Sequence, residues 1–129
     1  MNRILIVILA VIFCSGCGKL TVAEMRAKPA QVSQFYVEDS PQMVIRSVQS
    51  KQEECGYLWD GRVTTLDELG EAHIEYRSGG TPGAELLLFL VDLKKQDGKT
   101  SVSIYSANSS FTRGFKTLEY GAKGIRGCP

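Results

Sequence analysis

The chain has 129 residues, of which 43% are hydrophobic and 22% charged, so it fits one modest globular domain and is not disordered throughout. Of its 15 basic residues, Arg3 is the sole charge among the first 16 residues. The rest of the chain therefore has 14 basic and 14 acidic residues, which are mixed along the sequence. Because no net field remains to attract nucleic acid, we expect no nucleic-acid partner.

The N-terminus has the parts of a secretory signal. A short basic start precedes an unbroken apolar run over residues 4 to 13, and small residues follow it. A bilayer-spanning helix needs roughly 20 apolar residues, and this run is well short of that. We therefore expect an exported chain whose signal is removed, without a permanent transmembrane helix.

Residues Cys14-Ser15-Gly16-Cys17 resemble the lipobox of bacterial lipoproteins, with Cys14 at the position where leucine is usual. The resemblance implies a signal peptide over residues 1 to 16. It also implies that Cys17 becomes the new N-terminus and carries a lipid that contains palmitate. It concerns processing and implies nothing about activity. Cleavage after Gly16 by the ordinary signal peptidase, which would leave Cys17 as a plain thiol, is the alternative.

The same resemblance implies a location. In such lipoproteins an aspartate directly after the lipidated cysteine commonly retains the protein at the inner membrane, and Gly18 occupies that position here. The expected location is therefore the outer membrane, facing the periplasm, with the inner membrane and the cell surface as alternatives. Each buried methylene of an acyl chain adds about 0.8 kcal/mol, so the membrane is the first expected partner.

The cysteines fit this processing. If Cys14 leaves with the signal and Cys17 carries the lipid, Cys55 and Cys128 remain. Exported proteins meet oxidising conditions, in which thiols pair. We expect a disulfide between Cys55 and Cys128, with the two Cα atoms about 4.4 to 6.8 Å apart.

Residues 17 to 30 mix charged and small residues and predict a lipidated tether, with room for one helical turn. Residues 31 to 129 are expected to form a single domain. Its first strand is predicted over residues 32 to 37, which are rich in β-branched and aromatic side chains.

A helix is predicted over about residues 41 to 54. Ser40 and Pro41 supply an N-cap hydroxyl and a proline at the first helical position. Gly56 is placed to end the helix just after Cys55.

Strand patterns follow the helix. The Asp-Gly pair at residues 60 and 61 predicts a hairpin turn between two short runs. Residues 72 to 77 alternate between apolar and polar, as in a half-buried strand, whereas residues 86 to 93 are apolar on both faces, as in a central strand. A second Asp-Gly turn at residues 97 and 98 leads into a last strand over residues 100 to 106.

Phe111, Phe115 and Leu118 have helical spacing, although Gly114 lowers the helix propensity there. The predicted fold is α+β, an antiparallel sheet of four to five strands with the helix of about residues 41 to 54 packed on one face and a short C-terminal helical segment. Because the helix covers one face only, we expect the C-terminal segment to cover the second face.

The central strand suggests an alternative. Its second side needs a cover, and if the C-terminal segment does not supply one, something outside the chain must. The candidate partner or ligand face consists of Leu87, Phe89, Val91 and Leu93, which share one side of the strand, together with Trp59.

The sequence offers no catalytic set, so we expect neither an enzyme nor a cofactor. His73 is the sole histidine, and on the polar face of a strand it is most simply a solvated side chain. A zinc site would need His73 together with Cys55 and Cys128. Paired glutamates would be needed for glycoside cleavage.

These features favour a non-catalytic binding or assembly module, anchored to the membrane and acting on a protein partner of the cell envelope. An inhibitor or immunity lipoprotein that guards the envelope against an enzyme is a special case. The alternatives are a carrier of an apolar ligand, which needs a concave apolar pocket, and a hydrolase acting on the cell wall or on lipids.

Overall fold

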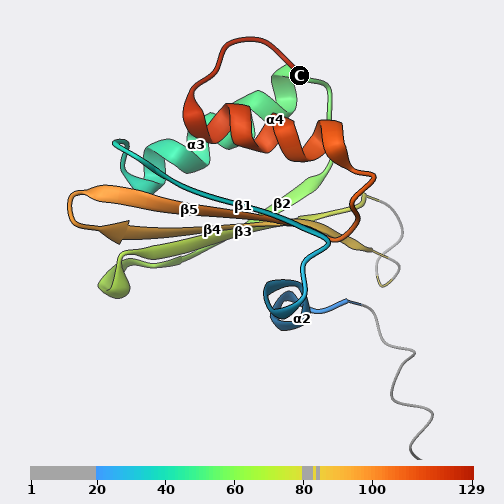
Figure 1. Cartoon of the computed structure of the whole chain (residues 1–129), viewed down its shortest axis with the longest axis horizontal. Helices are drawn as coiled ribbons and strands as arrows, with labels where there is room; N and C mark the ends of the chain where they lie inside the picture. The colour runs from blue at the N-terminus through green and yellow to red at the C-terminus, as the bar shows by residue number, and fades with distance from the viewer. Residues whose placement is uncertain (1–19, 80–82, 84) are drawn as a thin grey trace, which may run out of the picture.

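A computed structural model describes residues 20 to 79, 83 and 85 to 129, which form an α+β fold (Figure 1). The elements are, in chain order, α2 (Val22–Ala27), β1 (Gln31–Val37), α3 (Pro41–Glu54), β2 (Asp60–Leu66), the 3-10 turn η2 (Asp67–Leu69), β3 (Glu71–Arg77), β4 (Leu87–Gln96), β5 (Lys99–Ser106) and α4 (Thr112–Lys123). The five strands form one antiparallel sheet in the order β1-β5-β4-β3-β2. The predicted α+β class, with its main helix on one face of an antiparallel sheet, is confirmed.

Helix α3 begins and ends where the sequence predicts. The Ser40 hydroxyl accepts a hydrogen bond from the backbone N–H of Met43 at 3.3 Å, and Pro41 occupies the first turn. After Cys55 the chain leaves the helix through Gly56, whose φ is +81°, a left-handed conformation that favours glycine.

The predicted hairpin turn at Asp60 and Gly61 is wrong. Both residues belong to β2, and the chain reaches β3 through η2 and Gly70. Gly61 pairs with Tyr76 in the sheet, where a Cβ at Gly61 would lie 2.8 Å from the Tyr76 ring. The glycine therefore makes room for a core aromatic ring and does not turn the chain.

A β-bulge in β4 changes which side chains share a face. Tyr76 of β3 pairs with Phe89. The next residue, Arg77, pairs with Leu87, which leaves Leu88 as an extra residue in the ladder. Leu87 therefore turns to the α2 side, and the expectation that it shares a face with Phe89 is corrected, because strict alternation holds only where the pairing is regular.

Helix α4 lies beside α3, so the expectation that the C-terminal segment covers the second side of the sheet is wrong (Figure 1). Phe115 and Leu118 belong to the same buried cluster as Val48 of α3. The opposite side is covered in part by α2, whose Met25 is fully buried. The six residues of α2, which fall inside the predicted tether, are therefore part of the domain.

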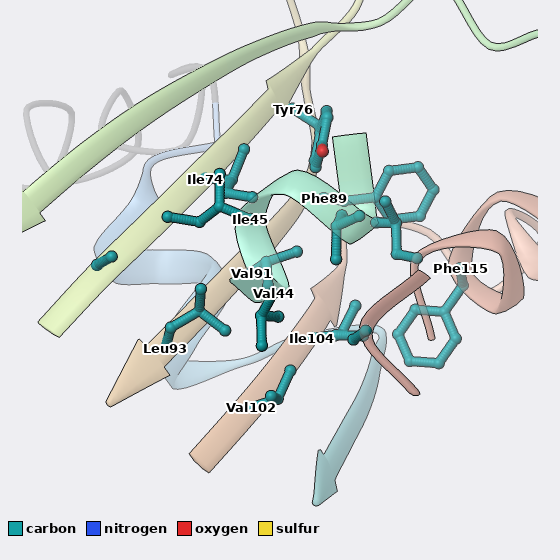
Figure 2. Close-up of a cluster of buried hydrophobic side chains, with 14 residues drawn as sticks. Val44, Ile45, Ile74, Tyr76, Phe89, Val91, Leu93, Val102, Ile104 and Phe115 are labelled. Carbon is teal, nitrogen blue, oxygen red and sulfur yellow. The ribbon is translucent and has the colours of Figure 1, made fainter. Parts of the chain in front are cut away.

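The main core fills the space between the sheet and the layer of α3 and α4 (Figure 2). The alternation predicted for β3 is confirmed, since its apolar residues point into this core and its polar residues point to the other side. The strand residues that are buried there include Ile74, Tyr76, Phe89, Val91, Leu93, Val102 and Ile104.

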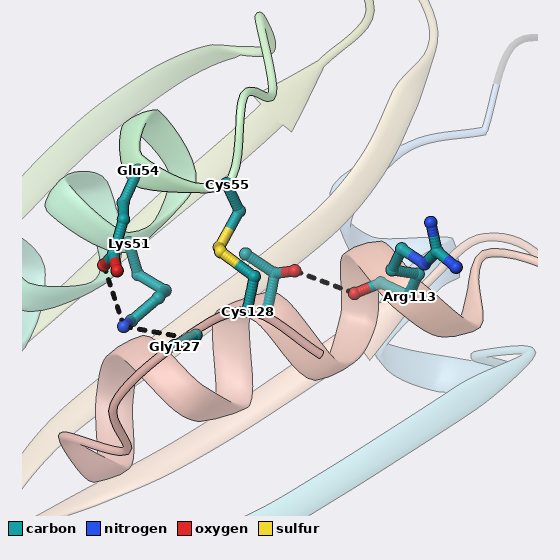
Figure 3. The surroundings of a disulfide bond; sticks show 7 residues. Lys51, Glu54, Cys55, Arg113, Gly127 and Cys128 are labelled. Carbon is teal, nitrogen blue, oxygen red and sulfur yellow. Dashed lines mark hydrogen bonds and ion pairs between the residues drawn. A yellow bond between two sulfur atoms is a disulfide. The ribbon is translucent and has the colours of Figure 1, made fainter.

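A disulfide joins Cys55 to Cys128, as predicted (Figure 3). The two Cα atoms are 5.7 Å apart, inside the expected range. The Lys51 ammonium group donates a hydrogen bond to the Gly127 carbonyl at 3.1 Å and lies 2.9 Å from the Glu54 carboxylate. The segment after α4 is thereby fixed against the end of α3.

Candidate functional site

A pocket of about 280 Å³ opens beside the N-terminus of α4, on the side of the sheet that carries α3 and α4. Three segments that are distant in sequence form it: the loop after α3, the bulged start of β4 and the first turn of α4. Its lining is mostly apolar and includes Tyr57, Trp59, Leu88, Phe89, Phe111 and Arg113.

Aromatic rings form the wall of the pocket. Tyr57 stacks on Trp59 with the ring centroids 4.1 Å apart. Trp59 lies 4.9 Å from Phe89, and Phe89 lies 5.9 Å from Phe111. Aromatic pairs at these distances contribute roughly 0.5 to 1.5 kcal/mol each beyond their buried area, so the wall is held in place by its own contacts.

The loop that carries Tyr57 and Trp59 is fixed by Gln52 of α3. The side-chain amide of Gln52, which is buried, donates hydrogen bonds to the carbonyl oxygens of Tyr57 at 3.2 Å and of Trp59 at 2.9 Å. A buried amide with two backbone partners restrains the loop strongly, because breaking either bond leaves a polar group unsatisfied. The pocket is therefore formed before any ligand binds.

Gly114 lets the rings approach helix α4. A Cβ at this position would lie 2.9 Å from the rings of Trp59 and of Phe89. The glycine that lowers helix propensity in the sequence thus has a packing role, since any side chain here would push the aromatic wall outward.

Positive charge is exposed at the pocket and along the segment that follows it. Between residues 112 and 126 the chain has one acidic residue, Glu119, which pairs with Lys123 at 3.7 Å. The four cations of this stretch are all exposed, and Arg113 lines the pocket itself. These cations are Arg113, Lys116, Lys123 and Arg126.

A second hollow, a polar groove of about 400 Å³, lies on the opposite side of the sheet next to α2. Arg26 of α2 donates two hydrogen bonds of 2.8 Å to the carboxylate of Asp92, and these raise the pKa of Arg26 above its usual value. Ser101, Ser103 and Tyr105 of β5 line the groove as well.

His73 lies in this polar groove, on the face where the sequence places it. Its Nε2 is 3.5 Å from the carboxylate of Glu75. The other oxygen of that carboxylate accepts a hydrogen bond from Arg77 at 2.9 Å. The Glu75 carboxylate is thus shared between two basic neighbours on the strand.

The structure separates the residues of the predicted partner face. Phe89, Val91 and Leu93 lie beneath α3 and α4 with at most 2% of their surface exposed, so the chain's own helices cover them. Leu87 is buried on the α2 side. Trp59 is half-buried in the wall of the pocket, where Phe89 reaches it from below. The lipidation site predicted at Cys17 lies outside the described residues.

Sequence reasoning missed Phe111 and Arg113. The helical spacing of Phe111 with Phe115 predicts a core position, but α4 begins only at Thr112 and Phe111 stands at its N-cap, half-buried in the pocket. The polar run at residues 108 to 110 was the available signal, because such residues mark the chain just before a helix.

A zinc site built from His73 and the two cysteines is ruled out, because Cys55 and Cys128 are bonded to each other. Within the part of the chain that the structure describes, no three histidine, cysteine or acidic side chains cluster as metal ligands would. None of the helices in that part is long and apolar enough to cross a membrane. Comparison with protein-family models, with curated proteins and with solved structures finds no match to this chain.

Proposed function

We propose that this protein is a lipid-anchored, non-catalytic binding module of the cell envelope that holds a protein partner through the aromatic pocket. The observation that carries the proposal is the pocket itself, a preformed aromatic hollow at the edge of the core. The lipid on Cys17 and the periplasmic face of the outer membrane rest on the lipobox resemblance. The disulfide between Cys55 and Cys128 agrees with an oxidising compartment.

The size of the pocket favours a protein partner. Small-molecule sites usually have volumes of about 300 to 1,000 Å³, and the volume here is about 280 Å³. Such a hollow accepts one large side chain but not a whole lipid chain. Tryptophan, tyrosine and arginine are enriched among the residues that dominate binding at protein interfaces, and Tyr57, Trp59 and Arg113 all line this pocket.

The charge at the mouth indicates what surrounds that side chain. Arg113 and Lys116 are exposed on the first turns of α4. A partner with acidic residues next to an apolar anchor would complement them, which speeds association and selects against basic partners. An envelope enzyme restrained by this module, as in an inhibitor or immunity lipoprotein, is one partner of this kind.

The test compares two charge reversals on the full-length lipidated protein. Arg113→Glu changes the mouth of the pocket, whereas Arg126→Glu reverses an exposed charge beyond the end of α4 and is the matched control. Envelope proteins captured by the wild-type chain are identified, and the affinity of each is measured with all three chains. We expect the partner to bind Arg113→Glu at least about tenfold more weakly, or about 1.4 kcal/mol, and to bind Arg126→Glu normally.

The fluorescence of Trp59 gives a second test of partner binding at the pocket. Trp59 is the single tryptophan of the chain, so its fluorescence should shift when the purified partner fills the pocket. A partner that loses no affinity with Arg113→Glu and leaves the emission of Trp59 unchanged binds elsewhere, and the pocket is then not the site. The anchor is tested separately by Cys17→Ser, which should remove the lipid and the membrane association.

A further inference from the structure

Helix α2 packs against the sheet only a few residues after Cys17, the expected lipidation site. Its Met25 is fully buried beside Leu87 and Leu90 of β4. Arg26 in the next position makes its two hydrogen bonds to Asp92. The chain is therefore held against the sheet from α2 onward, and only the residues before α2 act as a tether.

That tether is short. From Cys17 to Val22, where α2 begins, the chain spans five residues, which is about 18 Å when fully extended. The layer of α3 and α4 lies on the far side of the sheet from α2 (Figure 1). Since layers pack about 10 Å apart, the outer surface of α3 and α4 is more than about 20 Å from α2. The tether is too short to bring that surface to a bilayer that holds Cys17.

We propose that the lipidated protein rests with its α2 side on the bilayer and presents the aromatic pocket on the side away from it. The α2 side of the domain then contacts the headgroup layer of the lipid membrane. This inference rests on the lipid of the proposed function and extends it, because it fixes the direction from which a partner reaches the pocket.

The surface chemistry of the α2 side fits a membrane boundary. Val32 and Tyr36 of β1 are 48% and 60% exposed, and the register places them on the same face as Tyr105, which packs beneath α2. Leu66 of β2, 48% exposed, lines the polar groove on this face. Tyrosine and aliphatic side chains suit the level between headgroups and acyl chains.

The charges of this face are largely neutralised by each other. The ion pairs on this face have separations of 2.8 to 3.7 Å. Because paired charges attract anionic lipid weakly, we expect the orientation to need no anionic lipid and to change little with salt. The pairs are Arg26 with Asp92, Arg77 with Glu75, Lys94 with Glu71, and Arg62 of β2 with both Asp60 and Glu85.

The test measures paramagnetic broadening of backbone amide signals. Full-length lipidated protein is reconstituted into phosphatidylcholine nanodiscs that carry a gadolinium-chelating lipid. We expect the α2 amides to lose their signals and the α4 amides to keep theirs, because broadening falls steeply with distance. The control carries an insert of about twenty Gly and Ser residues between Lys19 and Leu20. An insert of that length reaches about 25 Å, so α2 and α4 should then be broadened equally.

Broadening of α4 that equals or exceeds that of α2 in the native-length chain would overturn the orientation. So would an insert that leaves the preference for α2 unchanged. The mass of the N-terminal peptide is read from the same sample. If Cys17 carries lipid and the orientation fails, the inference alone is wrong. If Cys17 carries no lipid, the proposed anchor is wrong, and the orientation is wrong with it.

Discussion

Gly121 of α4 lies directly against the main chain of Val48 in α3. A Cβ at Gly121 would stand 2.8 Å from the Cα of Val48 and 3.1 Å from the carbonyl oxygen of Ser47. Both of these neighbours are backbone atoms, so they move only if the helix moves. The two helices that cover the core are therefore spaced by a glycine contact.

Gly121→Ala should destabilise the protein by roughly 1 to 3 kcal/mol, because the extra methyl forces α4 away from α3. The helix propensity of alanine opposes this by about 1 kcal/mol, so a net loss means that the contact outweighs propensity. Chemical denaturation measures the difference. The control is Lys116→Ala on the exposed side of α4, which should change stability by less than about 0.5 kcal/mol. An alanine variant as stable as the wild type would show that the helices separate freely.

Replacing Cys55 and Cys128 together by serine should lower the free energy of unfolding by roughly 2 to 5 kcal/mol. The bond closes a loop over a sequence separation of 73, for which the chain-entropy model gives about 4.4 kcal/mol. The buried contacts of α4 with α3 do not involve the cysteines, so the folded variant should keep its circular dichroism spectrum and bind little apolar dye. A loss below about 1 kcal/mol would mean that the unfolded chain gains no freedom when the bond is removed.

The parts of the fold that the sequence predicted are encoded within a few neighbouring residues. Ser40 and Pro41 start α3 through one hydroxyl and one fixed φ. The turn between β4 and β5 follows from Asp97 and Gly98, whose φ angles are +52° and +77°. The alternation of β3 needs only its own side chains and a covered face.

The parts that were mispredicted depend on residues far away in the chain. Gly61 is read as a turn residue in sequence, and only the Tyr76 ring opposite it shows that it is a packing residue. The bulge at Leu88 and the position of α4 beside α3 are likewise set by the sheet and by the helix partner. Local pattern carries no information about such contacts.

The candidate site was predictable to a smaller extent than the fold. Trp59 stands out in the sequence, but its neighbours Leu88, Phe111 and Arg113 come from segments about 30 to 50 residues further on. The strand order and the bulge bring them together. Because the pocket is built from three segments, its position depends on the strand order, which could not be predicted from the sequence alone.

Tyr76→Phe should leave the protein equally stable or more stable by up to about 1 to 2 kcal/mol at neutral pH. The Tyr76 hydroxyl is buried, and it has no hydrogen-bond partner among the described residues. Burial also raises the pKa of Tyr76 above its usual value. Because the folded-state pKa exceeds the unfolded value of about 10, ionisation of Tyr76 has no effect on stability well below about pH 10 and lowers the stability of the folded state as the pH rises above it.

The difference in stability between wild type and Tyr76→Phe should therefore grow in favour of the variant above about pH 10. Denaturation curves at a series of alkaline pH values measure it. Tyr36→Phe is the control for loss of a tyrosine hydroxyl at the surface, since Tyr36 is 60% exposed. Parallel curves for wild type and Tyr76→Phe would contradict a buried hydroxyl with a raised pKa.

Met25→Ala should release α2, whereas Arg26→Gln should leave it docked. Removing a buried methionine side chain costs roughly 2 to 5 kcal/mol of packing free energy. Met25 is the buried residue of this six-residue helix, so α2 should not stay packed without it. The pair of Arg26 with Asp92 has side chains 42% and 26% exposed, so breaking it should cost about 1 kcal/mol or less. Hydrogen exchange should show the α2 amides unprotected in Met25→Ala, with β3 to β5 still protected. Greater exchange in Arg26→Gln would mean that the ion pair, and not the apolar contact, holds α2. Release of α2 also lengthens the tether to about residue 30, so lipidated Met25→Ala should lose its fixed orientation on the bilayer.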